Sequence, residues 1–423
     1  MSWLPTLFAA EAIPSAMITF VALLMFLQLG VGWEQSTLLC GLLTLPWVLK
    51  SFVRAKIRQI GYFSGQLRML EACITVLLIV LAFCFTDHYS SCWMIFATLF
   101  VLCLCCAWHE LVARMYYERM LRPQKQRFYN SWKMFISQST VVLTYGVLIM
   151  GVGFLEVFYH NRRNALALSW SMAIYVLAGI YLLLAVYNFF VLRPPHVVDH
   201  VRAETLGTAI KAEVRVIDRI THKPFWVWAV VCLALMLLPQ ALLFHSRVLF
   251  FIGTRAQEGL AASLQWIGLA QGTVGVIAFS SGLGIGHWLQ THRPSPRFHA
   301  VAAFALGLSP LVYLTLAFLT RDANYDNLLL LCIATFLAQF FFGIGLNSTM
   351  PLIRYLSGER YRSTINYLYI PLISLVMLLP MAASGWLVTH LGFERFFLVD
   401  TLLALPAWMA AHVAMRRISV SSN

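Results

Sequence analysis

Apolar stretches separated by short polar segments run along the whole chain, and twelve of them contain neither Lys nor Arg. They cover residues 4–29, 33–49, 69–86, 91–109, 134–155, 165–192, 224–245, 260–288, 299–320, 327–350, 364–390 and 396–415. A helix of about 17 to 25 mainly apolar residues crosses the hydrocarbon core of a bilayer. Only helices and closed barrels satisfy their backbone in lipid, and stretches such as MLLPMAASGWLV lack the alternating polarity of barrel strands. The pattern predicts an all-α membrane protein with twelve transmembrane helices.

The basic residues between these stretches predict how the chain crosses the membrane. If the N-terminus lies inside, 24 of the 30 Lys and Arg residues fall on the cytoplasmic side. Cytoplasmic loops of membrane proteins carry an excess of Lys and Arg, so we expect both termini to be cytoplasmic. The same asymmetry accounts for the net charge of +13. We therefore expect no nucleic-acid partner.

The longest polar segment, residues 193–223, lies between the sixth and seventh stretches. Pro194 and Pro195 end the sixth stretch, and AETLGTAIKAEVRVIDRI then combines helical spacing with mixed charge. We expect this segment to form a helix at the cytoplasmic surface. The chain would then comprise an N-terminal six-helix bundle over 1–192, a linker over 193–223 and a C-terminal six-helix bundle over 224–423.

Composition narrows the class of protein further. Hydrophobic residues make up 60% of the chain and charged residues 11%, whereas a soluble domain carries about 25% charged residues. These values exclude a soluble enzyme, a coiled coil and a disordered chain. The nine cysteines show no disulfide or metal-ligand spacing. No catalytic motif such as HExxH or GxSxG is present, so we expect neither an enzyme nor a cofactor or metal.

Ionisable residues inside apolar stretches are candidates for function, because burying a charge in lipid is costly. Glu11 lies eight residues after Trp3 and just before Pro14, so it is a candidate proton carrier or substrate contact. The alternative places Glu11 near the lipid headgroups. Glu71 opens the third stretch, where it would form a gate pair with Lys50 or Arg54, or lie at the rim among basic residues.

Two further candidates, His109 and Glu110, lie at the end of the fourth stretch and directly after it. Residues four apart on a helix pair readily, so we expect Glu110 to pair with Arg114. His109 is a candidate pH-sensitive group because histidine titrates near neutral pH. Glu11, Glu71, His109 and Glu110 are the proton-coupling or substrate candidates. For Asp400, in the last stretch, we expect a polar partner or an interfacial position.

Uncharged polar residues inside the stretches form a second set of candidates, since together they would line a polar cavity. Each alone is more often an interhelical hydrogen-bonding residue than a ligand contact. The set comprises Gln28, Tyr145, Gln240, Gln271, Gln339, Asn347 and Tyr367. The glycine-rich segment of the eighth stretch is interpreted as a site of close helix packing.

Two motifs resemble a known family. FAAEAIPSAM in the first stretch and LTLPWVLK (43–50) in the second are similar to the muropeptide-permease branch of the major facilitator superfamily, which also includes siderophore permeases. The residues that match the branch pattern are Glu11, Pro14, Leu45, Pro46, Trp47 and Lys50. Ala12 replaces the usual glycine. The segment 361–399 also resembles the last two spans of that branch.

The resemblance implies two six-helix bundles that rock about a midplane substrate site. It implies proton-driven import of a small organic solute, muropeptide-like or siderophore-like, across a bacterial inner membrane. The expected partners are this solute, protons and the lipid bilayer, and the expected state is a monomer. Lys50 would serve as an inner-gate charge.

One feature departs from the family pattern. An acidic residue is expected in the segment after the second span, but Arg58 stands roughly at that place and residues 51–70 contain no acid. The acidic gate residue of the family is therefore missing or replaced, with Glu71 as a candidate substitute, and the gate candidates are Lys50, Arg54 and Arg58. Three alternatives stay open: an exporter of amphiphilic or drug-like compounds, a non-transporting receptor or assembly factor on the same fold, and an embedded transferase that uses His109 and Glu110.

Overall fold

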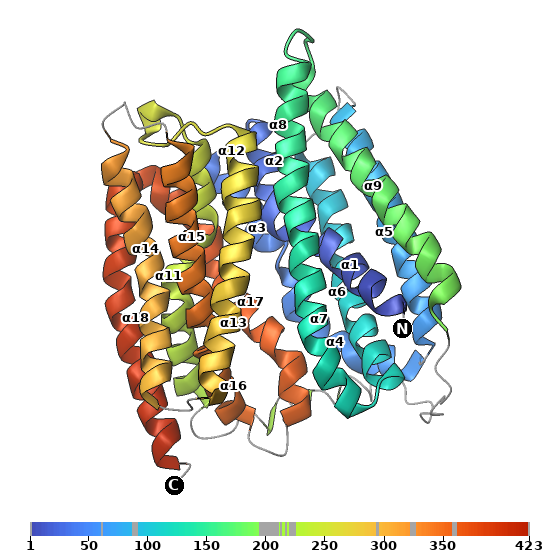
Figure 1. Cartoon of the computed structure of the whole chain (residues 1–423), viewed down its shortest axis with the longest axis vertical. Helices are drawn as coiled ribbons and strands as arrows, with labels where there is room; N and C mark the ends of the chain where they lie inside the picture. The colour runs from blue at the N-terminus through green and yellow to red at the C-terminus, as the bar shows by residue number, and fades with distance from the viewer. Residues whose placement is uncertain are drawn as a thin grey trace. The chain divides into compact units, whose positions relative to one another are not determined.

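The computed structural model describes residues 2–60, 62–86, 92–193, 226–292, 296–321, 327–357 and 362–421, with Lys211, Val214, Arg215, Asp218 and Arg219. Within these residues all regular secondary structure is helical (Figure 1). The expected helix at the cytoplasmic surface, between residues 193 and 223, lies almost entirely outside them.

Among the described residues, eleven helical segments are long and apolar enough to cross a membrane. They are Trp3–Gln28, Phe63–Phe85, Cys92–Met120, Gln124–Phe158, Ala165–Val191, Trp226–Ile252, Leu264–His292, Val301–Leu319, Leu328–Ile353, Leu368–Leu391 and Phe393–Arg417. The prediction of an all-α membrane fold is confirmed. Twelve spans, and the cytoplasmic position of the termini, remain predictions.

The second predicted span, 33–49, differs from the expectation. The chain turns at Leu43 and Thr44, which separates α3 (Trp33–Leu42) from α4 (Leu45–Ile60). Pro46 occupies the first turn of α4, where a missing N–H and a fixed φ favour the start of a new helix. Cys103 donates a hydrogen bond to the carbonyl oxygen of Leu43 over 2.9 Å, which holds the turn in place.

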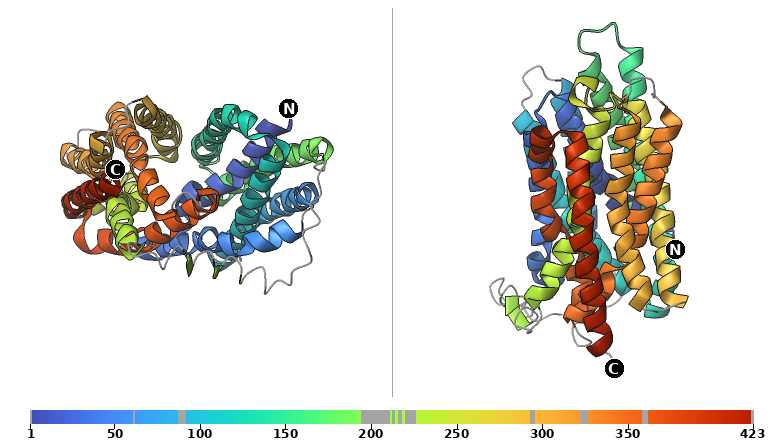
Figure 2. Two further views of the ribbon diagram at one scale, coloured as in Figure 1. Left: turned by 90° about the horizontal axis from the view of Figure 1, so that it is seen from below. Right: turned by 90° about the vertical axis from the view of Figure 1, so that its left-hand side faces the viewer.

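The helices form two compact units, and the first contains residues 1–30 and 43–217. Its described elements are α1 (Trp3–Ala16), η1 (Met17–Val21), α2 (Ala22–Gln28), α4, α5 (Phe63–Thr86), α6 (Cys92–Met120), α7 (Pro123–Val141), η2 (Val142–Val147), α8 (Leu148–Phe158) and α9 (Ala165–Val191). Helix α1 packs against α6, α7 and α9, and α5 packs against both α6 and α9. Seen end-on, these helices run side by side as a bundle (Figure 2).

The second unit contains residues 31–42 and 218–423. Its described elements are α3, α11 (Trp226–Ile252), η3 (Arg255–Gln257), α12 (Leu264–Ile267), η4 (Gly268–Gly275), α13 (Val276–His292), α14 (Pro296–Leu319), α15 (Leu328–Leu346), α16 (Thr349–Ser357), α17 (Arg362–Leu391) and α18 (Phe393–Ser421). Although α3 comes early in the chain, it packs against α17. Thr37 donates a hydrogen bond to the carbonyl oxygen of Ala382 over 3.1 Å, and small residues at this contact let the two backbones approach.

The glycine-rich segment of α13 is a close-packing surface, as expected. A side chain at Gly282 would clash with the backbone of Phe340, and one at Gly343 would clash with the backbone of Phe279. Asn347 donates hydrogen bonds to the carbonyl oxygens of Leu283 and Gly343, at 3.2 and 3.1 Å. Helices α13 and α15 are therefore held together by backbone contact.

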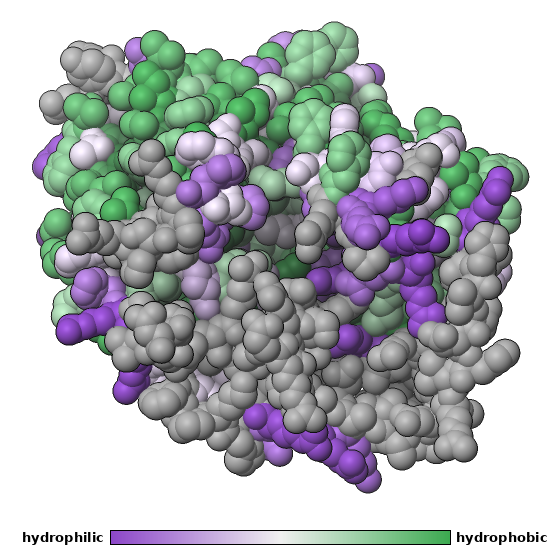
Figure 3. Space-filling view, turned by 60° about the horizontal axis from the view of Figure 1, so that its bottom comes forward, coloured by the Kyte–Doolittle hydropathy of each residue, from purple (hydrophilic) through white to green (hydrophobic). Residues whose placement is uncertain are grey.

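Large apolar side chains are exposed along the helices, as a lipid-facing surface requires. Leu183, Phe190 and Leu379 are each more than two thirds exposed. In the face shown by Figure 3, hydrophilic residues gather at the helix ends that come forward, whereas hydrophobic residues cover the flanks. The helix surfaces and helix ends thus differ in polarity as they do in membrane proteins.

Candidate functional site

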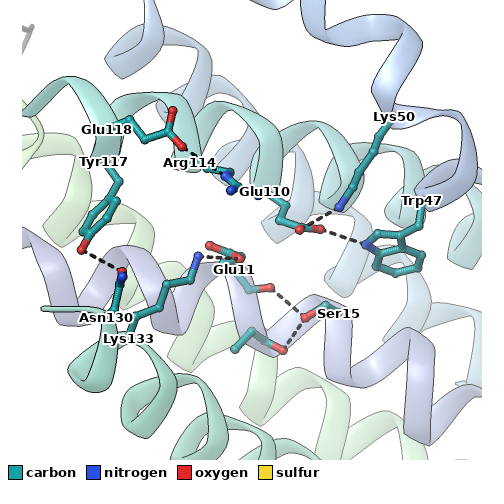
Figure 4. Close-up of polar contacts among 11 residues, drawn as sticks. Glu11, Ser15, Trp47, Lys50, Glu110, Arg114, Tyr117, Glu118, Asn130 and Lys133 are labelled. Carbon is teal, nitrogen blue, oxygen red and sulfur yellow. Dashed lines mark hydrogen bonds and ion pairs between the residues drawn. The ribbon is translucent and has the colours of Figure 1, made fainter. Parts of the chain in front are cut away.

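The first unit brings four charged residues from four different helices together (Figure 4). Lys50 on α4 forms an ion pair with Glu110 on α6, with 2.7 Å between Nζ and Oε1. Lys133 on α7 forms an ion pair with Glu11 on α1, with 3.5 Å between Nζ and Oε1. Lys133 also lies within electrostatic reach of Glu110. We refer to Glu11, Lys50, Glu110 and Lys133 as the charged cluster.

The Lys50–Glu110 pair is the better-buried half of the charged cluster. The exposed fraction is 6% for the Lys50 side chain and 18% for Glu110. Trp47 lies one turn before Lys50 on α4 and donates a hydrogen bond from Nε1 to Glu110 Oε2 over 3.1 Å. The LPWVLK motif thus places a hydrogen-bond donor and a cation on the face of α4 that meets α6.

The expected Glu110–Arg114 pair is wrong. Arg114 instead donates from Nε to Glu118 Oε1 over 3.2 Å, on a partly exposed face of α6. Glu110 pairs instead with the buried ammonium group of Lys50 on α4. Spacing within one helix did not reveal this contact because the partner comes from another helix.

The Glu11–Lys133 pair is more accessible. The Lys133 side chain is 34% exposed, and its ammonium group lies 5.1 Å from the ring centre of Phe8. Glu11 Oε2 is buried and has no hydrogen-bond partner among the described residues. Glu11 therefore has one carboxylate oxygen paired with a half-buried cation and one oxygen unpaired.

Two π-helical segments follow the Glu11–Lys133 pair along their helices. In η1 and η2 the rings of Phe20 and Tyr145 stack with centroids 5.2 Å apart and an interplanar angle of 16°. π-Helical turns are rare in proteins and occur frequently at functional sites. Tyr145, a predicted cavity residue, is thus buried at a contact between two irregular helical segments.

The other side of α6 carries a second polar group, which is buried. His109 Nε2 lies 3.3 Å from Glu71 Oε1, and Asn188 Nδ2 on α9 donates to the same oxygen over 2.8 Å. Glu71 Oε2 and His109 Nδ1 have no hydrogen-bond partner among the described residues. Both expectations for Glu71 are wrong, because it lies inside the bundle and pairs with His109 rather than with Lys50 or Arg54. His109 and Glu110 are consecutive on α6 but belong to different polar groups, since His109 pairs with Glu71 and Glu110 pairs with Lys50.

The predicted cavity residues have different surroundings. Gln271 and Gln339 lie beside the hydroxyl group of Tyr313, to which Gln271 donates over 3.0 Å. Gln240 donates to the carbonyl oxygen of Leu306 over 2.7 Å, so, like Asn347, it bonds a neighbouring helix backbone. Gln28 is half-buried at the end of α2 and Arg54 is half-buried on α4. The side chains of Arg58 and Tyr367 lie outside the described residues.

Lys133 and Arg247 lie just outside the predicted stretches 134–155 and 224–245, so the sequence pattern does not mark them as candidates. Helix α7 begins at Pro123 and carries Lys133 into the bundle. Arg247 lies within α11 and is 5% exposed. The expectation for Asp400 is also wrong, because it is fully buried and neither carboxylate oxygen has a hydrogen-bond partner among the described residues.

No group of three or more His, Cys, Asp and Glu residues is placed to hold a metal ion within the part of the chain that the structure describes. The charged cluster itself offers ion pairs and hydrogen bonds. Such groups bind polar solutes and exchange protons.

The fold is shared with solved membrane transporters. A bacterial homologue of the human lysosomal transporter Spinster, inward-facing and unoccupied, aligns with 98% of this chain and 96% of its own, with a TM-score of 0.71 and 13% identity. A structure described as giving insights into substrate recognition in proton-dependent oligopeptide transporters aligns with 99% of this chain and 98% of its own, with a TM-score of 0.67 and 12% identity.

The chain therefore has the fold of these solved transporters. The bacterial Spinster homologue in an occupied, inward-facing conformation agrees, with a TM-score of 0.65, 14% identity and coverage of 99% of this chain and 92% of its own. No family model matches the sequence, and no curated protein matches it significantly. At these identities the comparisons establish the fold, and the muropeptide-permease branch remains a prediction.

Proposed function

We propose that this protein is a secondary transporter that imports a small organic solute together with protons by alternating access. The solute is muropeptide-like or siderophore-like, as the motifs around Glu11 and Lys50 imply. The protein works as a monomer in a bacterial inner membrane, with both termini in the cytoplasm. Two six-helix bundles, 1–192 and 224–423, move about a midplane site.

The observation that carries this proposal is the charged cluster. Two acids and two lysines from α1, α4, α6 and α7 lie close enough for Lys133 to interact with either Glu11 or Glu110. Charges inside membrane-spanning helices are costly, and where they occur they commonly mark a substrate or proton pathway. Ion pairs that can exchange partners allow protonation of one acid to release a lysine for a charged group of the solute.

Each candidate residue has a proposed part in this cycle. Glu11, with one unpaired oxygen, takes up a proton or contacts the solute. The Glu71–His109 pair is a second proton site, because a carboxylate oxygen and an imidazole nitrogen 3.3 Å apart inside the bundle can share a proton. Lys50 acts as the inner-gate charge, and Arg54 and Arg58 lie on the same helix. Glu110 supplies the acidic partner of Lys50, in place of the acid that is absent from residues 51–70.

Proton-driven uptake into proteoliposomes tests the proposal. Radiolabelled muropeptide is supplied outside, and an inward proton gradient is imposed. Glu11→Gln keeps the shape of the side chain but cannot ionise, so we expect it to abolish accumulation while leaving the protein folded. Glu118→Gln is the matched control, since Glu118 is a partly exposed acid that pairs with Arg114 away from the charged cluster.

The control should accumulate solute as the wild type does. Full gradient-driven accumulation by Glu11→Gln would remove the proposed coupling role of Glu11. Accumulation by the wild type that does not respond to the proton gradient would contradict proton coupling itself.

A further inference from the structure

Arg247 is a buried cation with no acidic partner among the described residues. It lies in α11, is 5% exposed, and its guanidinium carbon is 5.1 Å from the ring centre of Phe244. Its Nε atom has no hydrogen-bond partner among the described residues, and no described acid forms an ion pair with it. A buried, unpaired charge is strongly unfavourable, so a function that needs the cation is the natural reason to retain it.

The polar groups around Arg247 are rich in hydrogen-bond donors. Its guanidinium group lies within electrostatic reach of Tyr313 on α14, which accepts a hydrogen bond from Gln271 on η4. Thr335 and Gln339 on α15 lie beside the Tyr313 hydroxyl, and the Thr335 hydroxyl has no hydrogen-bond partner among the described residues. Two hydroxyls and two amides thus lie together with a guanidinium within electrostatic reach, and the group has no carboxylate among the described residues.

The backbone of η4 brings these groups together. A Cβ atom at Gly275 would lie 3.1 Å from Thr335 Cγ2 and 3.3 Å from Gln339 Cγ, so η4 packs directly against α15. Gln271 lies one turn earlier on the same π-helical segment. Phe251 and Phe397 flank Tyr313, with ring centroids at 6.0 and 5.9 Å. The rings of Phe251 and Phe397 therefore form an apolar surface beside the polar group.

We propose that Arg247, Tyr313, Gln271 and Gln339 bind an anionic oxygen group, a carboxylate or a phosphate, of the transported solute. An arginine fork binds such groups with two parallel hydrogen bonds, and the hydroxyl and amide groups supply further donors. This inference rests on the proposed transport function and narrows its substrate class to organic anions. His245, next to Arg247, bonds the carbonyl oxygen of Met381 over 3.2 Å and takes no part.

Ligand binding by the purified, full-length protein tests this site without requiring transport. The probes are N-acetylmuramic acid, its uncharged methyl ester, inorganic phosphate and dioctanoyl phosphatidylglycerol, and the readout is thermal stability as a function of probe concentration. We expect N-acetylmuramic acid and phosphate to stabilise the wild type and the methyl ester to have no effect. Stabilisation by the lipid alone would assign the site to a lipid headgroup and overturn the solute assignment.

Arg247→Gln should weaken anion binding by about thirtyfold or more, because it removes the charged partner of a buried pair. Arg321→Gln is the matched control, since Arg321 is an exposed arginine of the same unit that pairs with Glu394, and it should bind as the wild type does. Without ligand, Arg247→Gln should be at least as stable as the wild type, since no ion pair is lost. Equal binding by Arg247→Gln, or no response of the wild type to any anion, would overturn the site.

Asp400 is the alternative partner for Arg247 within the protein itself. It is buried on α18, which packs against α11, and both of its oxygens lack partners among the described residues. We expect Asp400→Asn to leave anion affinity unchanged. Loss of stability in both single variants, with recovery in the double variant, would show that Arg247 pairs with Asp400 and would overturn the site.

Binding and transport can fail separately. Anion binding that depends on Arg247, with no uptake into proteoliposomes, would leave the site standing and contradict transport. Gradient-driven uptake that Arg247→Gln performs as well as the wild type would contradict the site and leave transport standing.

Discussion

Lys50 is the more buried member of its ion pair, and at the scale of single residues its charge depends on Glu110. The two groups are 2.7 Å apart, and Trp47 holds the second carboxylate oxygen. Removing one partner of a buried pair leaves the other charge uncompensated, whereas replacing both by apolar residues is often neutral. The pair is therefore expected to behave as a unit in mutagenesis.

We expect Glu110→Gln to lower the free energy of unfolding by about 3 kcal/mol, because Lys50 stays buried without a counter-charge. The double variant Lys50→Met with Glu110→Leu should recover most of that loss. Thermal unfolding of the purified protein measures both. A single variant as stable as the wild type would show that another acid of the charged cluster replaces Glu110.

Glu11, Glu71, His109 and Glu110 could be singled out from the sequence because an ionisable residue stands out in or beside an apolar stretch, and Lys50 because it belongs to the LPWVLK motif. The sequence was not sufficient to find their partners, which depend on how each helix is rotated against its neighbours. Lys133 was missed for a related reason. The apolar stretches are defined as segments without Lys or Arg, so each one stops next to such a residue even where the helix continues. Helix α7 continues through Lys133 in this way.

At the scale of elements, the contact between α13 and α15 depends on glycine at particular positions. Gly282→Ala should lower the free energy of unfolding by about 1–3 kcal/mol, because the added methyl group meets the backbone of Phe340. Gly284→Ala is the matched control, since nothing lies within 4 Å of a Cβ atom there. Equal thermal stability of the two variants would contradict this packing.

The helices themselves were largely predictable, since long apolar stretches leave the backbone few alternatives in lipid. The break at Leu43 and Thr44 was harder to predict. It depends on Pro46 starting a new helix and on Cys103 bonding the turn, and only the second of these is a tertiary contact. The π-helical segments η1, η2 and η4 have no sequence signature that periodicity detects.

At the scale of the whole molecule, the distribution of Lys and Arg predicts the topology. A fluorescent protein fused after Asn423 should fluoresce, because it folds in the cytoplasm. Alkaline phosphatase fused after Arg163, in the turn between α8 and α9, should be active, because it reaches the oxidising side. The opposite pattern of reporter activity would contradict cytoplasmic termini.

The central claim is that the protein moves a solute across the membrane. Solute counterflow tests it most directly, since exchange needs alternating access but no imposed gradient. Proteoliposomes are loaded with unlabelled muropeptide and diluted into a trace of labelled muropeptide. We expect label to accumulate transiently in vesicles with the wild-type protein and not in protein-free vesicles. Binding of muropeptide by the purified protein without any counterflow would contradict transport and support a receptor on the same fold.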